Sequence, residues 1–138
     1  MGRSILVIED DPFSLELMRC LLEARWHTVA SARDGVEGLR RALAGDLDLV
    51  LCDIRLPGLS GLELVRRFRA HPALRRLPLV AVTAQAMAGD QDRILGQGFD
   101  GYLSKPIEPW TFVEQVESAI RRGVHPGPGP AVLGPAHG

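Results

Sequence analysis

The sequence predicts a single α/β domain in which a parallel β-sheet is covered by helices on both faces. Three observations lead to this fold class. Five short apolar runs alternate with five stretches of helical periodicity along residues 1–122. The runs are continuously apolar, which is typical of strands that are buried on both faces. A helical stretch follows each run, as the crossover between parallel neighbouring strands requires. We therefore expect a doubly wound, three-layer architecture.

The individual elements follow from apolar periodicity and local capping signals. The expected strands are Ser4–Ile8, His27–Ser31, Leu47–Cys52, Leu79–Thr83 and Gly101–Leu103, and the expected helices are 12–25, 35–44, 62–70, 89–97 and 108–122. Asp11 is a favourable N-cap for the first helix, and Pro12 suits its first position. The second helix is expected to bury one face, made of Val36, Leu39, Ala42 and Leu43.

Length, composition and charge exclude several classes of protein. The 138 residues suffice for one domain that folds without a disulfide or metal staple. A net charge of −1 gives no footprint for nucleic acid or for an anionic membrane. No apolar run is long enough to span a bilayer, and no signal peptide is recognised. Cys20 and Cys52 have no metal-ligand spacing, so we expect buried free thiols in a reducing cytoplasm.

The last sixteen residues, 123–138, differ in composition from the rest of the chain. They are rich in glycine and proline, aperiodic and nearly uncharged. This composition predicts a disordered tail or the start of a linker, after a domain at residues 1–122. We therefore expect no DNA-binding or enzymatic domain after residue 122.

Polar side chains follow four of the five predicted strands. They are Glu9, Asp10, Asp11, Asp53, Thr83 and Lys105. The carboxyl ends of parallel strands share one edge of the sheet, which is where ligands bind. Converging carboxylates repel one another unless a cation joins them, and oxygen ligands suit Mg²⁺. A carboxylate beside Mg²⁺, an ammonium and a hydroxyl can attack phosphorus. Lys105 is the only lysine among 16 basic residues, which favours a site that needs a compact ammonium.

Four segments in order carry a resemblance to a known family: I-L-V-I-E-D-D (5–11), L-V-L-C-D-I-R-L-P-G-L-S-G (49–61), V-A-V-T-A (80–84) and G-Y-L-S-K-P-I (101–107). The sequence resembles a response-regulator receiver domain of the CheY-like superfamily, and is most similar to single-domain DivK-like regulators. The resemblance covers about Arg3 to Arg122. It implies a flavodoxin/CheY-like sheet of five parallel strands in the order 2-1-3-4-5.

The resemblance also implies the role of each site residue. Asp53 is expected to be the phosphoacceptor. Mg²⁺ (or Mn²⁺) is expected to bind Asp10 directly, Glu9 through water, and the backbone carbonyl of Arg55 as well as Asp53. Lys105 is expected to pair with Asp53 and then to contact the phosphoryl group. The alternative acidic pair, Asp10 and Asp11, would still include Asp10, but Pro12 favours Asp11 as the helix cap.

The remaining implied roles concern the switch and the loops. Thr83 is expected to swing toward the phosphoryl group, Tyr102 to turn inward behind it, and Ala84 to leave room for it. Pro57 and Gly61 match the loop after the acceptor. The Lys105–Pro106 peptide matches one that the family usually holds in cis.

By the same resemblance the chain is a two-component phosphorelay response regulator. Its partners would be a histidine kinase or histidine phosphotransfer protein, and a downstream protein that binds the surface of the helix at 89–97, the next strand and the last helix. It would be a signalling switch that catalyses only its own phosphorylation and dephosphorylation, in the cytoplasm. Phe13 and Leu17 lie beside the acidic edge and either dock the phosphodonor or pack in the core.

Three other functions are alternatives to this one. A pseudo-receiver that signals by binding, without phosphorylation, stays an alternative, although the presence of all five key side chains argues against it. A haloacid-dehalogenase-type phosphatase carries D-x-D-x-T/V after its first strand, where this chain reads E-D-D-P-F. A flavodoxin-like FMN binder needs a Ser/Thr-rich phosphate loop there, and three carboxylates would repel the ligand.

Overall fold

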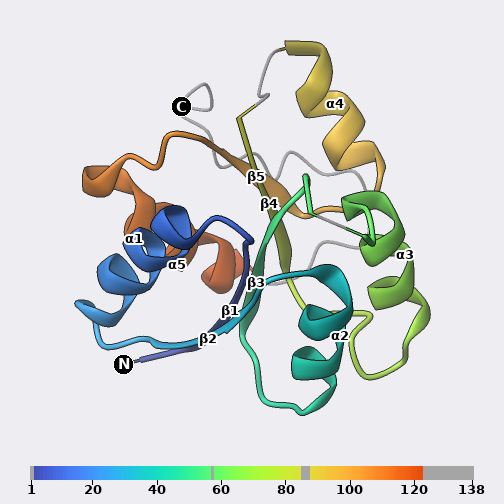
Figure 1. Cartoon of the computed structure of the whole chain (residues 1–138), viewed down its shortest axis with the longest axis horizontal. Helices are drawn as coiled ribbons and strands as arrows, with labels where there is room; N and C mark the ends of the chain where they lie inside the picture. Colours follow the sequence, from blue (N-terminus) through green and yellow to red (C-terminus); the bar gives the residue numbers. More distant parts are fainter. Residues whose placement is uncertain (1, 57, 85–87, 123–138) are drawn as a thin grey trace.

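The computed structural model describes residues 2–56, 58–84 and 88–122. The strands are β1 (Ser4–Ile8), β2 (Thr28–Ala32), β3 (Leu49–Asp53), β4 (Leu79–Thr83) and β5 (Gly101–Ser104). The helices are α1 (Pro12–Glu23), α2 (Gly35–Leu43), α3 (Gly61–Ala70), α4 (Ala88–Gly96) and α5 (Pro109–Arg122). All strand pairs are parallel, in the order β2-β1-β3-β4-β5 (Figure 1). The predicted fold class and strand order are confirmed, while the expected disordered tail at 123–138 lies outside the described residues.

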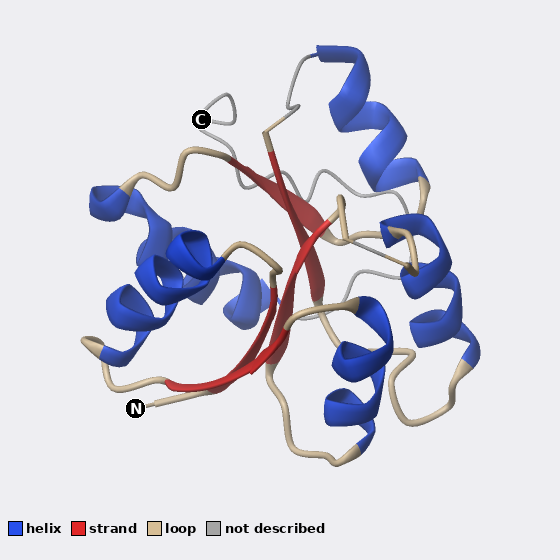
Figure 2. Ribbon diagram, in the orientation of Figure 1, coloured by secondary structure: helices blue, strands red, loops and turns tan. Residues whose placement is uncertain are grey.

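The helices form two layers, one on each face of the sheet. Helices α1 and α5 cover one face, and α2, α3 and α4 cover the other (Figure 2). Alternate strand residues supply two separate cores because successive side chains point to opposite faces. On β1, for example, Ile5 and Val7 pack with α1 and α5, whereas Leu6 and Ile8 pack toward the other helices. The continuous apolar runs of the sequence are thus explained by burial on both faces.

Strand β2 begins at Thr28, one residue later than the sequence predicted. His27 lies just before the strand, and its buried side chain contacts two other segments. Its Nδ1 accepts a hydrogen bond from the amide of Arg3 at 3.0 Å, and its Nε2 lies 2.8 Å from Oε2 of Glu117 on α5. The pairing of β2 with β1 then starts at Ser4 and Thr28. This buried imidazole ties the amino end of β1 to α5, a contact that the sequence did not suggest.

Helix α2 bears out half of the predicted buried face, because Ala42 is buried and Leu39 packs partly against the core. Val36 is 63% exposed and Leu43 is 45% exposed, whereas Gly35, Gly38 and Ala42 are buried. A Cβ on Gly38 would overlap the side chain of Ile8, so the helix approaches the sheet through its small residues. This close approach turns the larger apolar side chains outward.

Arg69, near the end of α3, holds three segments together at the amino edge of the sheet. Its guanidinium donates to the carbonyl oxygens of Arg75, Leu77 and Gly98 at 3.0, 2.9 and 2.8 Å. It also donates to Oδ2 of Asp100 at 2.8 Å, and that oxygen accepts the amide of Leu79 at 2.7 Å. The sequence pattern did not predict a structural role for Arg69 or Asp100, because each is a charged residue without a neighbouring motif.

We expect Gly98→Ala to destabilise the domain by about 1–3 kcal/mol, because the backbone and the space at this position both require glycine. Gly98 has φ +117°, and an added Cβ would lie 2.7 Å from Cγ1 of Val65. Gly45→Ala is the matched control, since φ is +110° but nothing lies within 4 Å of the added Cβ. Urea unfolding should show the larger loss at position 98, and equal losses would contradict the steric argument.

Two further sequence expectations concern the membrane and the thiols. No helix in the described ranges is both long and apolar enough to cross a bilayer. Both cysteines are free, and Cys52 is buried as expected. The expectation of burial is wrong for Cys20, which is exposed because it lies on the solvent side of α1, four residues after Glu16.

Candidate functional site

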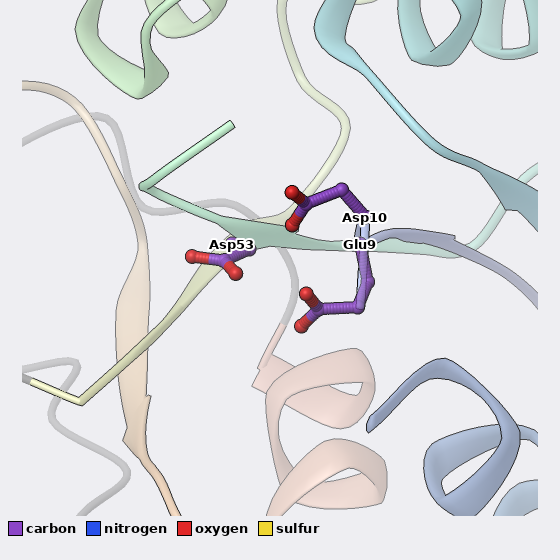
Figure 3. A group of neighbouring side chains, drawn as sticks. All are labelled: Glu9, Asp10 and Asp53. Carbon is purple, nitrogen blue, oxygen red and sulfur yellow. The ribbon is translucent and has the colours of Figure 1, made fainter. Parts of the chain in front are cut away.

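Three carboxylates gather where β1 and β3 end (Figure 3). Glu9 and Asp10 follow β1 directly, and Asp53 is the last residue of β3, so the parallel pairing of the two strands brings them together. Each residue offers one oxygen, and these oxygens all lie within 4.8 Å of one another. Glu9 and Asp53 are buried, whereas Asp10 is exposed. The predicted convergence at the carboxyl edge of the sheet is therefore present in the structure.

Lys105 lies across the two buried carboxylates. It follows β5, and its Nζ lies 2.8 Å from Oε1 of Glu9 and 3.1 Å from Oδ2 of Asp53. The pairing with Asp53 agrees with the expectation from the resemblance. The contact with Glu9 was not foreseen, although a lone ammonium among converging carboxylates is a signal from which it could have been inferred.

Burial and charge shift the protonation of this cluster. Burial raises the pKa of Glu9 from 4.5 to about 7, against the opposing effects of Lys105 and the Asp11 amide, and Asp53 adds to the rise. Burial alone would lower the pKa of Lys105, but its contacts with Glu9 and Asp53 outweigh this and raise it. The ammonium therefore keeps its proton at neutral pH, whereas the Glu9 carboxyl holds its proton to a higher pH than an ordinary glutamate does.

The donor set fits a divalent cation such as Mg²⁺. Oε1 of Glu9 is inaccessible to solvent and, besides its close approach to the ammonium, accepts no well-directed hydrogen bond from the described residues. Its Oε2 accepts the amide of Asp11 at 3.1 Å, and Oδ1 of Asp53 accepts the amide of Arg55 at 2.9 Å. Hard oxygen ligands in a partly exposed group are what Mg²⁺ requires, with water completing the shell.

Asp11 takes the capping role that Pro12 suggested. It is the N-cap of α1, and its Oδ2 accepts hydrogen bonds from the amide and the hydroxyl of Ser14 at 3.1 and 2.7 Å. These hydrogen bonds lower the pKa of Asp11. Its carboxylate is not part of the group of three, so the geometry favours Glu9 and Asp10 as the acidic pair.

The expected switch residues lie at the ends of β4 and β5. Thr83 is buried, and its carbonyl oxygen accepts the amide of Lys105 at 2.9 Å, while Ala84 is exposed. Tyr102 is only 2% exposed, and burial raises its pKa. The tyrosine was expected to turn inward on phosphorylation, but here its side chain is already inside.

The loop residues are placed as follows. Gly61 starts α3, where a Cβ would lie 3.0 Å from Cα of Ile54, so the close approach of this loop needs glycine. The Lys105–Pro106 peptide is cis, as the resemblance implied. Pro57 lies outside the described residues. Phe13 is 76% exposed, which excludes it from the core, whereas Leu17 packs partly against the core.

Comparison with known proteins agrees with this fold and identifies the family. A family model of the response regulator receiver domain matches residues 5–117. The polar-differentiation response regulator DivK of Brucella ovis is 40% identical over 120 residues, which cover 87% of this chain and 98% of that protein.

Solved structures show the same likeness. The receiver domain of the sensor histidine kinase PA1611 from Pseudomonas aeruginosa has a magnesium ion coordinated in its active-site cleft. It has a TM-score of 0.76 and 32% identity, and the match covers 88% of this chain and 97% of that one. The chemotaxis response regulator CheY4 of Vibrio cholerae shares the fold, with a TM-score of 0.81 at 22% identity over 86% of this chain and 99% of that one. The chain belongs to the response regulator receiver domain family of two-component signalling.

Proposed function

We propose that Asp53 is the phosphoacceptor of a phosphorelay switch and that Glu9, Asp10, Lys105 and Thr83 assist its phosphorylation. The observation that carries this proposal is the position of Lys105, whose ammonium bridges the buried carboxylates of Asp53 and Glu9 beside the exposed Asp10. An ammonium held against a potential nucleophile is placed to neutralise the charge of an incoming phosphoryl group.

The proposed reaction is an exchange of one bond to phosphorus for another. A carboxylate oxygen of Asp53 attacks the phosphorus of a phosphohistidine, the new oxygen–phosphorus bond forms as the phosphorus–nitrogen bond breaks, and the imidazole leaves. The Arg55 amide, 2.9 Å from Oδ1, orients the carboxylate. The Lys105 ammonium contacts Asp53 before the reaction and would contact the phosphoryl oxygens after it. Attack of water on the same phosphorus then returns Asp53 to a carboxylate and releases phosphate.

Mg²⁺ (or Mn²⁺) is the proposed cofactor of this reaction. Glu9, Asp10, Asp53 and the backbone carbonyl of Arg55 would hold it, and when bound it would neutralise charge on the transferring group. Thr83 and Ala84 lie at the end of β4 beside the acceptor strand, and we propose that the Thr83 hydroxyl binds a phosphoryl oxygen.

The proposed partners follow from the family. The phosphodonor is a histidine kinase or a histidine phosphotransfer protein, and Phe13, which is exposed on α1 beside the acidic edge, would contact it. The output is a protein that binds the surface of α4, β5 and α5. The two free cysteines fit a reducing compartment, and we propose a cytoplasmic location for a domain at residues 1–122.

The test is the intact mass of the protein after incubation with acetyl phosphate and Mg²⁺. We expect the wild type to gain one phosphoryl group, and we expect EDTA to abolish the gain. Asp53→Asn should not gain it, because an amide is a poor nucleophile. Asp48→Asn is a matched control on the opposite edge of the sheet and should be phosphorylated like the wild type. A wild type that stays unmodified while folded would instead support a pseudo-receiver that signals by binding.

We expect the apparent affinity for Mg²⁺ to rise as pH increases from about 6 to about 8, with proton release on binding. Glu9 has a pKa of about 7, so a large share of the metal-free protein carries a proton there that the metal must displace. Calorimetric titration in buffers of different ionisation enthalpy measures that proton. Glu9→Gln should remove the proton release, and an affinity of the wild type that is independent of pH would contradict the prediction.

A further inference from the structure

A cluster of arginines lies on the outer surface of α3 and the turn that follows it, residues 71–77. Arg66 and Arg67 are exposed on α3, and Arg75 and Arg76 are exposed in the turn. Arg69 lies one turn after Arg66 on the helix, and its guanidinium binds the carbonyl oxygens of residues 75 and 77. These hydrogen bonds hold the backbone of the turn against α3. We call the exposed arginines of these two adjoining segments, Arg66, Arg67, Arg75 and Arg76, the arginine surface.

The positive charge of this surface is not neutralised within the described part of the chain. Arg66, Arg75 and Arg76 have no carboxylate partner among the described residues, whereas several other arginines have one. Two carboxylates that contact residues of these segments, Glu63 and Asp100, have partners of their own. Glu63 pairs with Arg67 at 3.6 Å, and Asp100 accepts from Arg69 and from the amide of Leu79. Three arginines on these two segments are therefore exposed without a carboxylate partner among the described residues.

We propose that the arginine surface binds an acidic segment of a partner protein. A guanidinium presents paired donors that match a carboxylate, so a row of three favours a chain rich in Asp and Glu. The net charge of −1 provides no long-range attraction for a nucleic acid, whose binding rests on many phosphate contacts. A short acidic peptide needs only the local positive field that these side chains supply.

The position of this surface separates it from the phosphorylation site. The turn at 71–77 leads into the amino end of β4, whereas Asp53 and Thr83 lie at the carboxyl ends of their strands (Figure 1). A strand of five residues spans about 16 Å, so the turn and the acceptor lie at opposite edges of the sheet. Binding at the arginine surface therefore leaves the acceptor accessible. It is expected to tether the domain to a partner whether or not Asp53 is phosphorylated.

The test is fluorescence anisotropy with a fluorescein-labelled oligoglutamate peptide and the full chain. We expect the wild type to bind and the affinity to fall as salt rises. The double variant Arg75→Glu/Arg76→Glu should lose at least about tenfold in affinity. Arg121→Glu/Arg122→Glu at the end of α5 is the matched control, because each double change moves the net charge from −1 to −5. The control should stay within about twofold of the wild type.

The remaining outcomes each decide the proposal. Absence of binding by the wild type, or equal losses in both double variants, would overturn it. A DNA duplex of equal charge that competes better than the peptide would assign the surface to nucleic acid and also overturn it. Asp53→Asn should bind the peptide like the wild type, so this result stands apart from the phosphorylation test. Circular dichroism and phosphorylation by acetyl phosphate should be unchanged in Arg75→Glu/Arg76→Glu, which shows that the variant is folded.

Discussion

Replacing Lys105 with methionine is expected to slow phosphorylation by acetyl phosphate about 100-fold or more. Methionine keeps most of the aliphatic stem but removes the ammonium that lies 2.8 Å from Glu9 and 3.1 Å from Asp53. In the proposed reaction this ammonium neutralises charge that develops on the phosphoryl group, and the chain contains no other lysine that could replace it. The initial rate of mass gain at saturating Mg²⁺ measures the effect.

The same variant separates charge stabilisation from metal binding. Removing a positive charge from beside the three carboxylates lowers the repulsion that a divalent cation meets. We therefore expect Mg²⁺ to bind Lys105→Met at least as tightly as the wild type at a pH where Glu9 is ionised in both proteins. That pH is higher for the variant, because the Lys105 ammonium lowers the pKa of Glu9 in the wild type. Arg122→Met removes a distant charge and should leave both quantities unchanged. A phosphorylation rate close to that of the wild type would remove Lys105 from the mechanism.

Arg69→Ala is expected to lower the free energy of unfolding by about 3–5 kcal/mol. The guanidinium binds three carbonyl oxygens and the carboxylate of Asp100, whose side chain is only 10% exposed. Its removal leaves a nearly buried charge unpaired and frees the connections between α3, β4 and β5. Urea unfolding followed by circular dichroism measures the loss.

Two further variants show whether the lower free energy of unfolding comes from the unpaired Asp100 carboxylate. Arg67→Ala lies on the same helix, pairs with Glu63 at 3.6 Å and is exposed, so it should cost at most about 0.5 kcal/mol. Adding Asp100→Asn to Arg69→Ala should recover about 1–2 kcal/mol, since the amide oxygen still accepts from Leu79 but carries no charge. If the double variant is no more stable than Arg69→Ala, the unpaired carboxylate is not the cause.

Local chemistry was sufficient to predict most of the backbone. Asp11 and Pro12 marked the start of α1, and the run at Leu79–Thr83 gave β4 with its observed bounds. Such signals involve residues within a few positions of one another, so they act before and independently of the final packing. Ligands bind at the carboxyl edge of parallel strands, and this rule predicted that Glu9, Asp10 and Asp53 converge. The structure places one carboxylate oxygen of each within 4.8 Å of the others.

Tertiary packing decided what these local signals could not. His27 and Glu117 are 90 residues apart, and their contact exists only because α5 crosses the amino end of β1. The exposed side of α2 was likewise decided by the fit of Gly38 against Ile8, since periodicity describes a helix but not how closely it approaches a sheet. The sequence by itself determined the fold class, and it predicted the three carboxylates and the lysine that the structure gathers at one edge of the sheet. Only the three-dimensional structure decided that Lys105 also contacts Glu9, because that contact depends on how far β1, β3 and β5 bring their ends together.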